Sequence, residues 1–191
     1  LWWLLRGDFS SSIEEVASLR YGEGISRVSR GIKAFYALDD QDEQEPNTAA
    51  VSLRGVAYRD CTPRELLLAD ARCALGRRPV EHSARRSLPR YSGLPLETWR
   101  PALGKRFFVR ELWPAQRLLG QRSVLAGGSA VVQMPTSAGK SRSTELIIRS
   151  AFLSGRASLA VVVGPFRALC HEIRESLARA FRGEHVNVNE L

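Results

Sequence analysis

The amino-acid sequence predicts an α/β fold in which an incomplete parallel sheet with flanking helices follows a mainly helical N-terminal region. Two short apolar runs, 129–134 and 158–163, have the composition of buried strands. Each run is followed by a segment with apolar residues at helical spacing, 141–153 and 168–182. This alternation is typical of a parallel sheet covered by helices. Only one further short run, 186–188, follows, so we expect the sheet to be incomplete.

Residues 1–76 are predicted to form a helical accessory region. Ser11 and Glu14 have the spacing of a capping box, and apolar residues recur at helical spacing in the following segment, so 8–38 is interpreted as a helical pair. Those apolar residues are Ile25, Val28, Ile32 and Phe35. The acidic stretch near 39–48 has the composition of a mobile linker.

A second helix in this region has a clear start signal. Thr62, Pro63 and Glu65 combine an N-cap residue, a first-turn proline and a capping glutamate. The pattern predicts a helix that runs to about Ala74 and ends at Gly76, because glycine commonly terminates helices.

Residues 77–110 are predicted to form a basic, proline-rich connector. They carry nine basic residues against Glu81 and Glu97, and four prolines interrupt regular structure. Four aromatic residues are interleaved with this charge: Tyr91, Trp99, Phe107 and Phe108. Basic and aromatic residues together can bind nucleic acid, but an irregular connector that its aromatics pin to the next domain has the same composition. We favour the connector.

The composition bounds the class of protein. The chain has 191 residues, of which 44% are apolar, and a net charge of +8, which favours a globular protein with a polyanionic partner such as nucleic acid. Its three cysteines lie far apart and its three histidines are scattered, so neither a zinc site nor a disulfide framework is indicated. This cysteine usage fits the reducing cytoplasm. The apolar run 1–5 is too short to cross a membrane.

The strongest functional signal is the segment 131–141, which reads Val-Val-Gln-Met-Pro-Thr-Ser-Ala-Gly-Lys-Ser. An apolar run leads into a loop of small residues, which is the composition of a phosphate-binding loop. The small side chains of Ser137, Ala138 and Gly139 leave main-chain N–H groups free to converge on phosphate oxygens. The dipole of the helix that follows adds to this attraction.

Two residues at the end of the loop supply the chemistry. Lys140 provides a cation for the β- and γ-phosphates, and Ser141 provides a hydroxyl for Mg²⁺. Met134 occupies the position of the first glycine of the strict pattern, so the assignment depends on the flanking segments. The sequence therefore predicts a protein that uses a nucleoside triphosphate.

Two segments resemble motifs of superfamily-two helicases, in particular the DExH helicases of the Ski-like branch. Residues 111–116 resemble the Leu-aromatic-Pro-x-Gln element, whose glutamine reads adenine, and Gln116 lies 24 positions before Lys140, a spacing that fits. Residues 134–141 resemble the Pro-Thr-small-small-Gly-Lys-Ser/Thr form of the phosphate loop. This form accounts for the missing glycine, and it implies that Pro135 and Thr136 also border the nucleotide.

A third segment, 161–169, is similar to the next motif of the same family. In the family this loop touches the phosphate backbone of a single strand, which implies Pro165 and Arg167 as nucleic-acid contacts here. The resemblance implies that 111–191 is the N-terminal part of a RecA-like helicase motor domain, truncated in this chain.

The resemblance implies an ATP-dependent nucleic-acid helicase or translocase that uses ATP and Mg²⁺. Lys140 and Ser141 would be the catalytic residues, with Ser141 holding the metal ion. We favour single-stranded DNA over RNA as the partner, since richness in arginine and alanine suggests a GC-rich bacterial genome. The N-terminal region offers a surface for a protein partner.

The family's Asp-Glu-x-His box and second motor domain are missing from this sequence, so we expect this segment alone to be inactive. Two alternatives stay open at this point. One is a phosphate-loop nucleotide switch or kinase. The other is a noncatalytic nucleic-acid-binding fragment in which 77–110 make the contacts.

Overall fold

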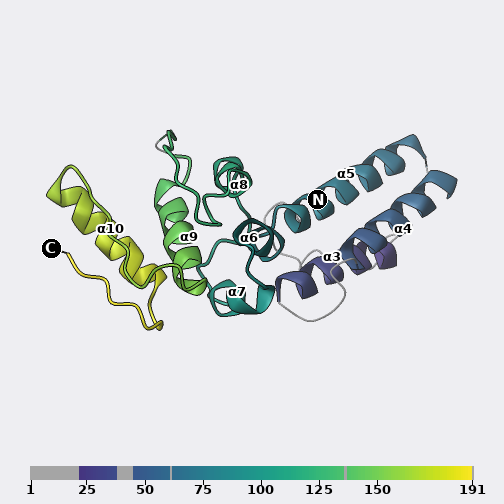
Figure 1. The fold of residues 1–191 in the computed structure, drawn as a ribbon. Helices are drawn as coiled ribbons and strands as arrows, with labels where there is room; N and C mark the ends of the chain where they lie inside the picture. Colours follow the sequence, from purple (N-terminus) through teal and green to yellow (C-terminus); the bar gives the residue numbers. More distant parts are fainter. Residues whose placement is uncertain (1–21, 38–44, 61, 136, 191) are drawn as a thin grey trace. The chain divides into compact units, whose positions relative to one another are not determined.

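The computed structural model describes residues 22–37, 45–60, 62–135 and 137–190. The described residues form eight helices (Figure 1). Their bounds are α3 (Gly22–Tyr36), α4 (Glu45–Asp60), α5 (Pro63–Glu81), α6 (Ala84–Ser92), α7 (Leu96–Leu103), α8 (Pro114–Gln121), α9 (Lys140–Leu153) and α10 (Arg167–Ala180). None of these helices combines the length and the apolar composition needed to cross a bilayer.

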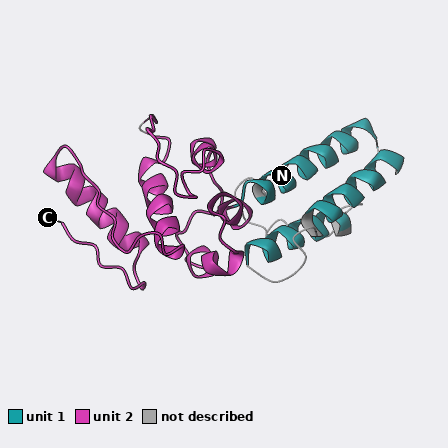
Figure 2. Ribbon diagram, viewed as in Figure 1, with its two compact units in different colours: residues 1–83 teal, residues 84–191 magenta. Residues whose placement is uncertain are grey.

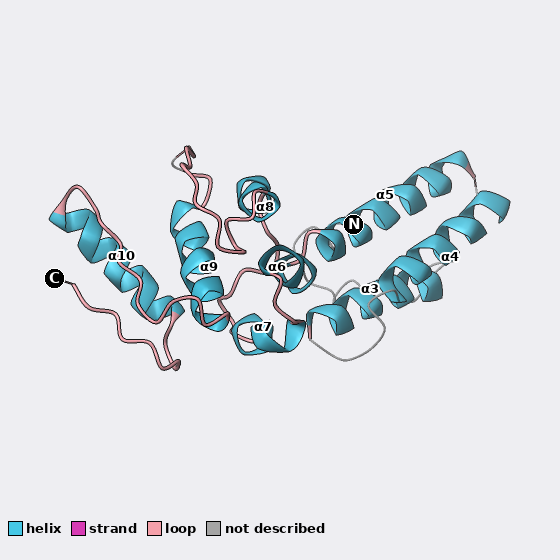
Figure 3. Ribbon diagram, in the orientation of Figure 1, coloured by secondary structure: helices cyan, strands magenta, loops and turns pink. Residues whose placement is uncertain are grey.

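The described residues contain no parallel sheet, so the prediction of an α/β, RecA-like fold was wrong. The described residues contain helices and irregular segments but no β-strand (Figure 3). The apolar runs 129–134 and 158–163 are irregular and open to solvent: Val131 is fully exposed and Val163 is 88% exposed. The run 186–188 is irregular too.

The error has a physical reason. An apolar run becomes a strand only where a neighbouring strand takes its main-chain hydrogen bonds and another layer covers its faces. No main-chain hydrogen bond joins the two runs in the described part of the chain. Their hydrophobicity shows that these segments are able to form strands, but the two runs do not pair with each other.

The chain divides into two compact units, residues 1–83 and 84–191 (Figure 2). In unit 1, α3, α4 and α5 pack together around an apolar core. The apolar residues predicted at helical spacing in α3 all lie in that core: Ile25, Val28, Ile32 and Phe35. The predicted capping box at Ser11 and Glu14, and residues 39–44 of the predicted linker, lie outside the described residues. Helix α4 begins at Glu45.

Helix α5 begins as the sequence predicts but ends later. Thr62 caps it: the Glu65 N–H donates to Thr62 Oγ1, and Glu65 Oε2 accepts from the Thr62 N–H at 2.9 Å. The helix continues through Gly76 to Glu81. A Cβ on Gly76 would lie 3.2 Å from both Ile32 and Val28. This glycine therefore allows α5 to approach α3 closely and does not terminate the helix.

Unit 2 contains α6 to α10, and two of its helices lie where the prolines predicted broken structure. Pro89 lies inside α6 and Pro101 inside α7. The core is built around the Trp99 indole, which is fully buried and donates to Ser92 Oγ at 3.0 Å. Its other buried apolar residues are Ala84, Leu88, Ala102, Phe108, Leu112, Leu125 and Leu146.

Candidate nucleotide and nucleic-acid site

The predicted phosphate loop turns into α9 at a left-handed glycine. Gly139 has φ +83° and ψ 39° and is the N-cap of the helix. Its carbonyl accepts from the Ser143 N–H at 2.9 Å and from Ser143 Oγ at 3.0 Å. The Ala138 N–H donates to the Pro135 carbonyl at 3.1 Å, which closes the preceding turn. Thr136 lies outside the described residues.

The groups predicted to bind phosphate and metal are accessible. Lys140 and Ser141, the first two residues of α9, both have exposed side chains, as does Ser137 in the loop. The N–H groups in the first turn of a helix have no partner within that helix, and they carry its positive dipole end. Together these groups form a basic, donor-rich surface that suits a phosphate group.

Gln116 is held beside this loop. Its side chain is 3% exposed, and its Oε1 accepts from the Trp113 N–H at 2.9 Å, at the start of α8. A Cβ on Gly139 would lie 2.9 Å from Gln116 Nε2 and 3.9 Å from Trp113 Cε3. The structure thus brings the predicted adenine-reading amide to the glycine of the predicted phosphate loop. The left-handed φ of Gly139 and its closeness to the Gln116 amide both favour glycine at this position.

Trp113 is a residue whose position the sequence did not single out. Trp113 is 54% exposed, and its indole lies beside Gly139. An exposed aromatic face beside a phosphate loop suits stacking on a nucleotide base. The signal that marks it is its place as the aromatic residue of the 111–116 element.

The predicted nucleic-acid contacts lie at the start of α10. Pro165 and Arg167 are exposed, and Phe166 between them is 72% exposed. Behind this turn a Cβ on Gly164 would lie 2.9 Å from Cys170 Sγ, so the loop folds closely onto the helix. No hydrogen bond or ion pair described in the structure links Arg167 to the loop before α9.

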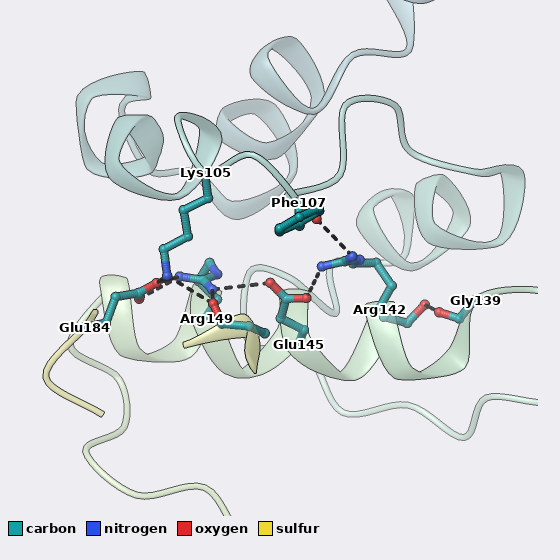
Figure 4. Close-up of polar contacts among 9 residues, drawn as sticks. Lys105, Phe107, Gly139, Arg142, Glu145, Arg149 and Glu184 are labelled. Atoms are coloured by element: carbon teal, nitrogen blue, oxygen red, sulfur yellow. Dashed lines mark hydrogen bonds and ion pairs between the residues drawn. The ribbon is translucent and has the colours of Figure 1, made fainter. Parts of the chain in front are cut away.

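A row of alternating charges runs along α9 to the segment after α10 (Figure 4). Arg142, in the first turn of α9, pairs with Glu145, and Glu145 Oε1 accepts from Arg149 Nη2 at 3.2 Å. Arg149 Nη1 donates to both oxygens of Glu184, at 2.7 and 2.6 Å. Lys105 pairs with the same Glu184 carboxylate. The row therefore joins the helix that follows the loop to the far end of α10.

Burial and pairing act in opposite directions on Glu184. Partial burial favours its neutral form, but hydrogen bonds from Arg149 and Lys105 outweigh it and lower the pKa of the carboxyl. Glu184 is therefore held ionised. None of the five charged residues in this row was singled out from the sequence. Within α9 the contacts of Glu145 have ordinary helical spacing, and those of Glu184 with Arg149 and Lys105 join segments that are far apart in the chain.

The net positive charge of the chain lies in unit 2. Residues 84–191 carry 17 basic and 7 acidic residues, a net charge of +10, and residues 1–83 carry 11 basic and 13 acidic residues. A net charge of this sign attracts polyanions, and it lies on the unit that contains the predicted phosphate loop. No cluster of metal-ligating side chains occurs in the described residues.

Comparisons with known proteins give one partial similarity. The chain is 28% identical over 89 residues to the Hachiman protein HamB of Bacillus cereus. That match covers 47% of this chain and 8% of HamB, so the chain corresponds to a small part of the length of this relative. No model of a known family matches the chain, and no solved structure matches it.

Proposed function

We propose that this chain belongs to an ATP-dependent helicase or translocase that acts on single-stranded nucleic acid, with DNA favoured over RNA. The observation that carries the proposal is the convergence at Gly139. The buried Gln116 amide and the exposed Trp113 indole meet the loop that ends in Lys140 and Ser141. An amide and an aromatic face suit a purine base, and the loop with its cation suits phosphates.

Each residue has a role in this proposal. Trp113 and Gln116 bind and orient the base. The main-chain N–H groups of Ser137, Gly139 and the first turn of α9 bind the phosphates. Lys140 neutralises phosphate charge, and Ser141 supplies one oxygen ligand for Mg²⁺. ATP with Mg²⁺ supplies the phosphoryl group whose transfer drives movement. The positive charge of unit 2 draws the strand towards the nucleotide site, where Pro165 and Arg167 contact its backbone.

The first test measures nucleotide binding by this chain. We expect a fluorescent ATP analogue with Mg²⁺ to bind, and Lys140→Ala to weaken its binding at least about ten-fold, because a charge-assisted phosphate contact is worth about 1.5–3 kcal/mol. Arg179→Ala removes another exposed cation, from the last turn of α10, and serves as the matched control. Equal binding by the wild type and Lys140→Ala would contradict the site.

The second test measures steady-state ATP hydrolysis by the complete natural protein, with and without single-stranded DNA or RNA. Strand-stimulated hydrolysis that Lys140→Ala abolishes supports the motor and identifies its polymer. A rate of hydrolysis that neither DNA nor RNA changes favours a nucleotide switch or kinase. Strand binding without nucleotide binding favours a noncatalytic nucleic-acid-binding protein.

A further inference from the structure

The four aromatic residues interleaved with basic residues in 77–110 do not share one environment. Trp99 is fully buried and Phe108 is 8% exposed, so both belong to the core of unit 2. Tyr91 is partly buried and packs against α8, where a Cβ on Gly120 would lie 2.2 Å from its ring. Phe107 is 79% exposed. Of these four rings, only the Phe107 ring is available to a partner.

The Phe107 backbone is fixed although its ring is exposed. The Phe107 carbonyl accepts from Arg142 Nη2 at 3.2 Å (Figure 4). The next residue, Phe108, is anchored in the core, and its N–H donates to the Lys105 carbonyl at 3.1 Å. Lys105 Nζ in turn donates a hydrogen bond to the Ala180 carbonyl at 3.0 Å. The turn between α7 and α8 therefore presents the ring from a rigid base, which lowers the entropy cost of binding a partner.

The surroundings of the ring indicate the chemistry of that partner. The Arg106 guanidinium lies over the Phe107 ring, 5.3 Å from its centroid. Residues 105–110 contain three cations and no acid. A single exposed phenylalanine is common on protein surfaces. An exposed ring among cations, on a unit with a net charge of +10, matches a ligand that has both flat apolar faces and negative charges.

We propose that Phe107 and Arg106 form a stacking platform for a base of single-stranded nucleic acid, with Arg106 paired to the adjacent phosphate. The proposal extends the proposed function, on which it rests for the identity of the polymer. An unpaired base offers a face that Phe107 can stack on, whereas the bases of a duplex are already stacked. Arg142 links this turn to the first turn of α9, so a hydrogen bond joins the platform to the helix that follows the predicted phosphate loop.

Fluorescence anisotropy with a labelled oligo-deoxythymidine strand, in the absence of nucleotide, tests the proposal. We expect Phe107→Ala to weaken binding about ten-fold, the usual size of one base–aromatic stack. Phe107→Trp should retain the affinity. Leu118→Ala removes another exposed apolar side chain, 52% exposed on α8, and should bind like the wild type. Arg106→Gln should make binding less sensitive to salt.

A duplex of the same length separates stacking from charge. Phe107→Ala should bind the duplex as the wild type does, because no base face is free there. Equal affinity of the wild type and Phe107→Ala for the single strand would overturn the platform. An equal loss on duplex and single strand would overturn it too, since a general charge effect would then explain the result.

The outcome is independent of the nucleotide site. If Phe107→Ala weakens strand binding in a protein that binds no ATP analogue, the platform stands and the proposed motor function fails. If ATP binding is intact and Phe107→Ala has no effect on the strand, the reverse holds. Because the Phe107 ring is exposed, its removal should leave the thermal unfolding unchanged, which checks that the variant folds.

Discussion

Replacing Arg149 with methionine should destabilise unit 2 strongly. The Arg149 side chain is 2% exposed and sits between the two carboxylates of the charged row, and its Nη2 also donates to the Ala180 carbonyl at 3.0 Å. Its guanidinium lies 4.4 Å from the centroid of the Phe181 ring. Methionine keeps much of the aliphatic volume but removes the charge and every one of these contacts.

The size of this loss of stability depends on which cations still pair with the carboxylates of Glu145 and Glu184. Removing one partner of a buried ion pair typically costs about 3–5 kcal/mol, because the other charge stays buried. Here Glu145 keeps Arg142, and Glu184 keeps Lys105 and is 26% exposed. Both carboxylates therefore retain a cation, which places the cost at the lower end, about 3 kcal/mol. For a unit of this size that corresponds to a fall in Tm of roughly 15 °C.

Chemical denaturation combined with amide hydrogen exchange in α9 and α10 measures this loss and assigns it to unit 2. The matched control is Arg54→Met in unit 1. Arg54 also pairs with a carboxylate, at 2.7 Å from Asp70, but its side chain is 51% exposed. Such exposed pairs contribute little, so we expect no measurable change. A loss below about 1 kcal/mol in Arg149→Met, or equal losses in the two variants, would refute this reasoning.

Three further predictions concern other features of the structure. Because its pKa is lowered in the folded state, Glu184 stabilises unit 2 above the ordinary carboxyl pKa of about 4.3, and this stabilisation is lost as the pH falls further. Urea unfolding of the wild type and Glu184→Gln should therefore converge in acid, and a constant difference across pH would argue against the effect. Gly120→Ala drives a Cβ into the Tyr91 ring and should cost about 1–3 kcal/mol in thermal unfolding. Gly55→Ala, which meets nothing within 4 Å inside α4, should be neutral or stabilising, and similar losses in both would show that packing is not the cause. Burial raises the pKa of the Cys73 thiol, so alkylation followed by mass spectrometry should be slow until unit 1 opens, and fast labelling of the folded chain would contradict this burial.

Features that depend on neighbouring residues were predictable from the sequence. The start of α5 follows from Thr62 and Glu65, which lie within one helical turn of each other. The end of α5 could not be predicted in this way, because Gly76 allows a close contact with α3 that the local sequence pattern does not reveal. The prediction of strands failed for the same reason. An apolar run indicates that a segment is able to form a strand, but strand pairing requires a partner elsewhere in the chain.

The candidate site shows the same division. The sequence identified Gln116 and Gly139 separately, through two short motifs, and their approach is a property of the fold. The exposure of Phe107 could not be predicted either, because nothing in the sequence distinguishes it from its buried neighbour Phe108. The pairing of Arg149 with Glu184 spans 35 positions, and no local rule connects them.

The solvent-exposed valines of 129–134 and 158–163 have a consequence for the behaviour of the chain at high concentration. Exposed apolar segments promote association between molecules. The like charge of unit 2 opposes this attraction by keeping molecules apart. Salt shortens the reach of that repulsion to about 8 Å at physiological ionic strength but leaves the apolar attraction intact. Colloidal stability therefore depends on ionic strength, and a bound polyanion, which neutralises the same charge, acts in the same direction as salt.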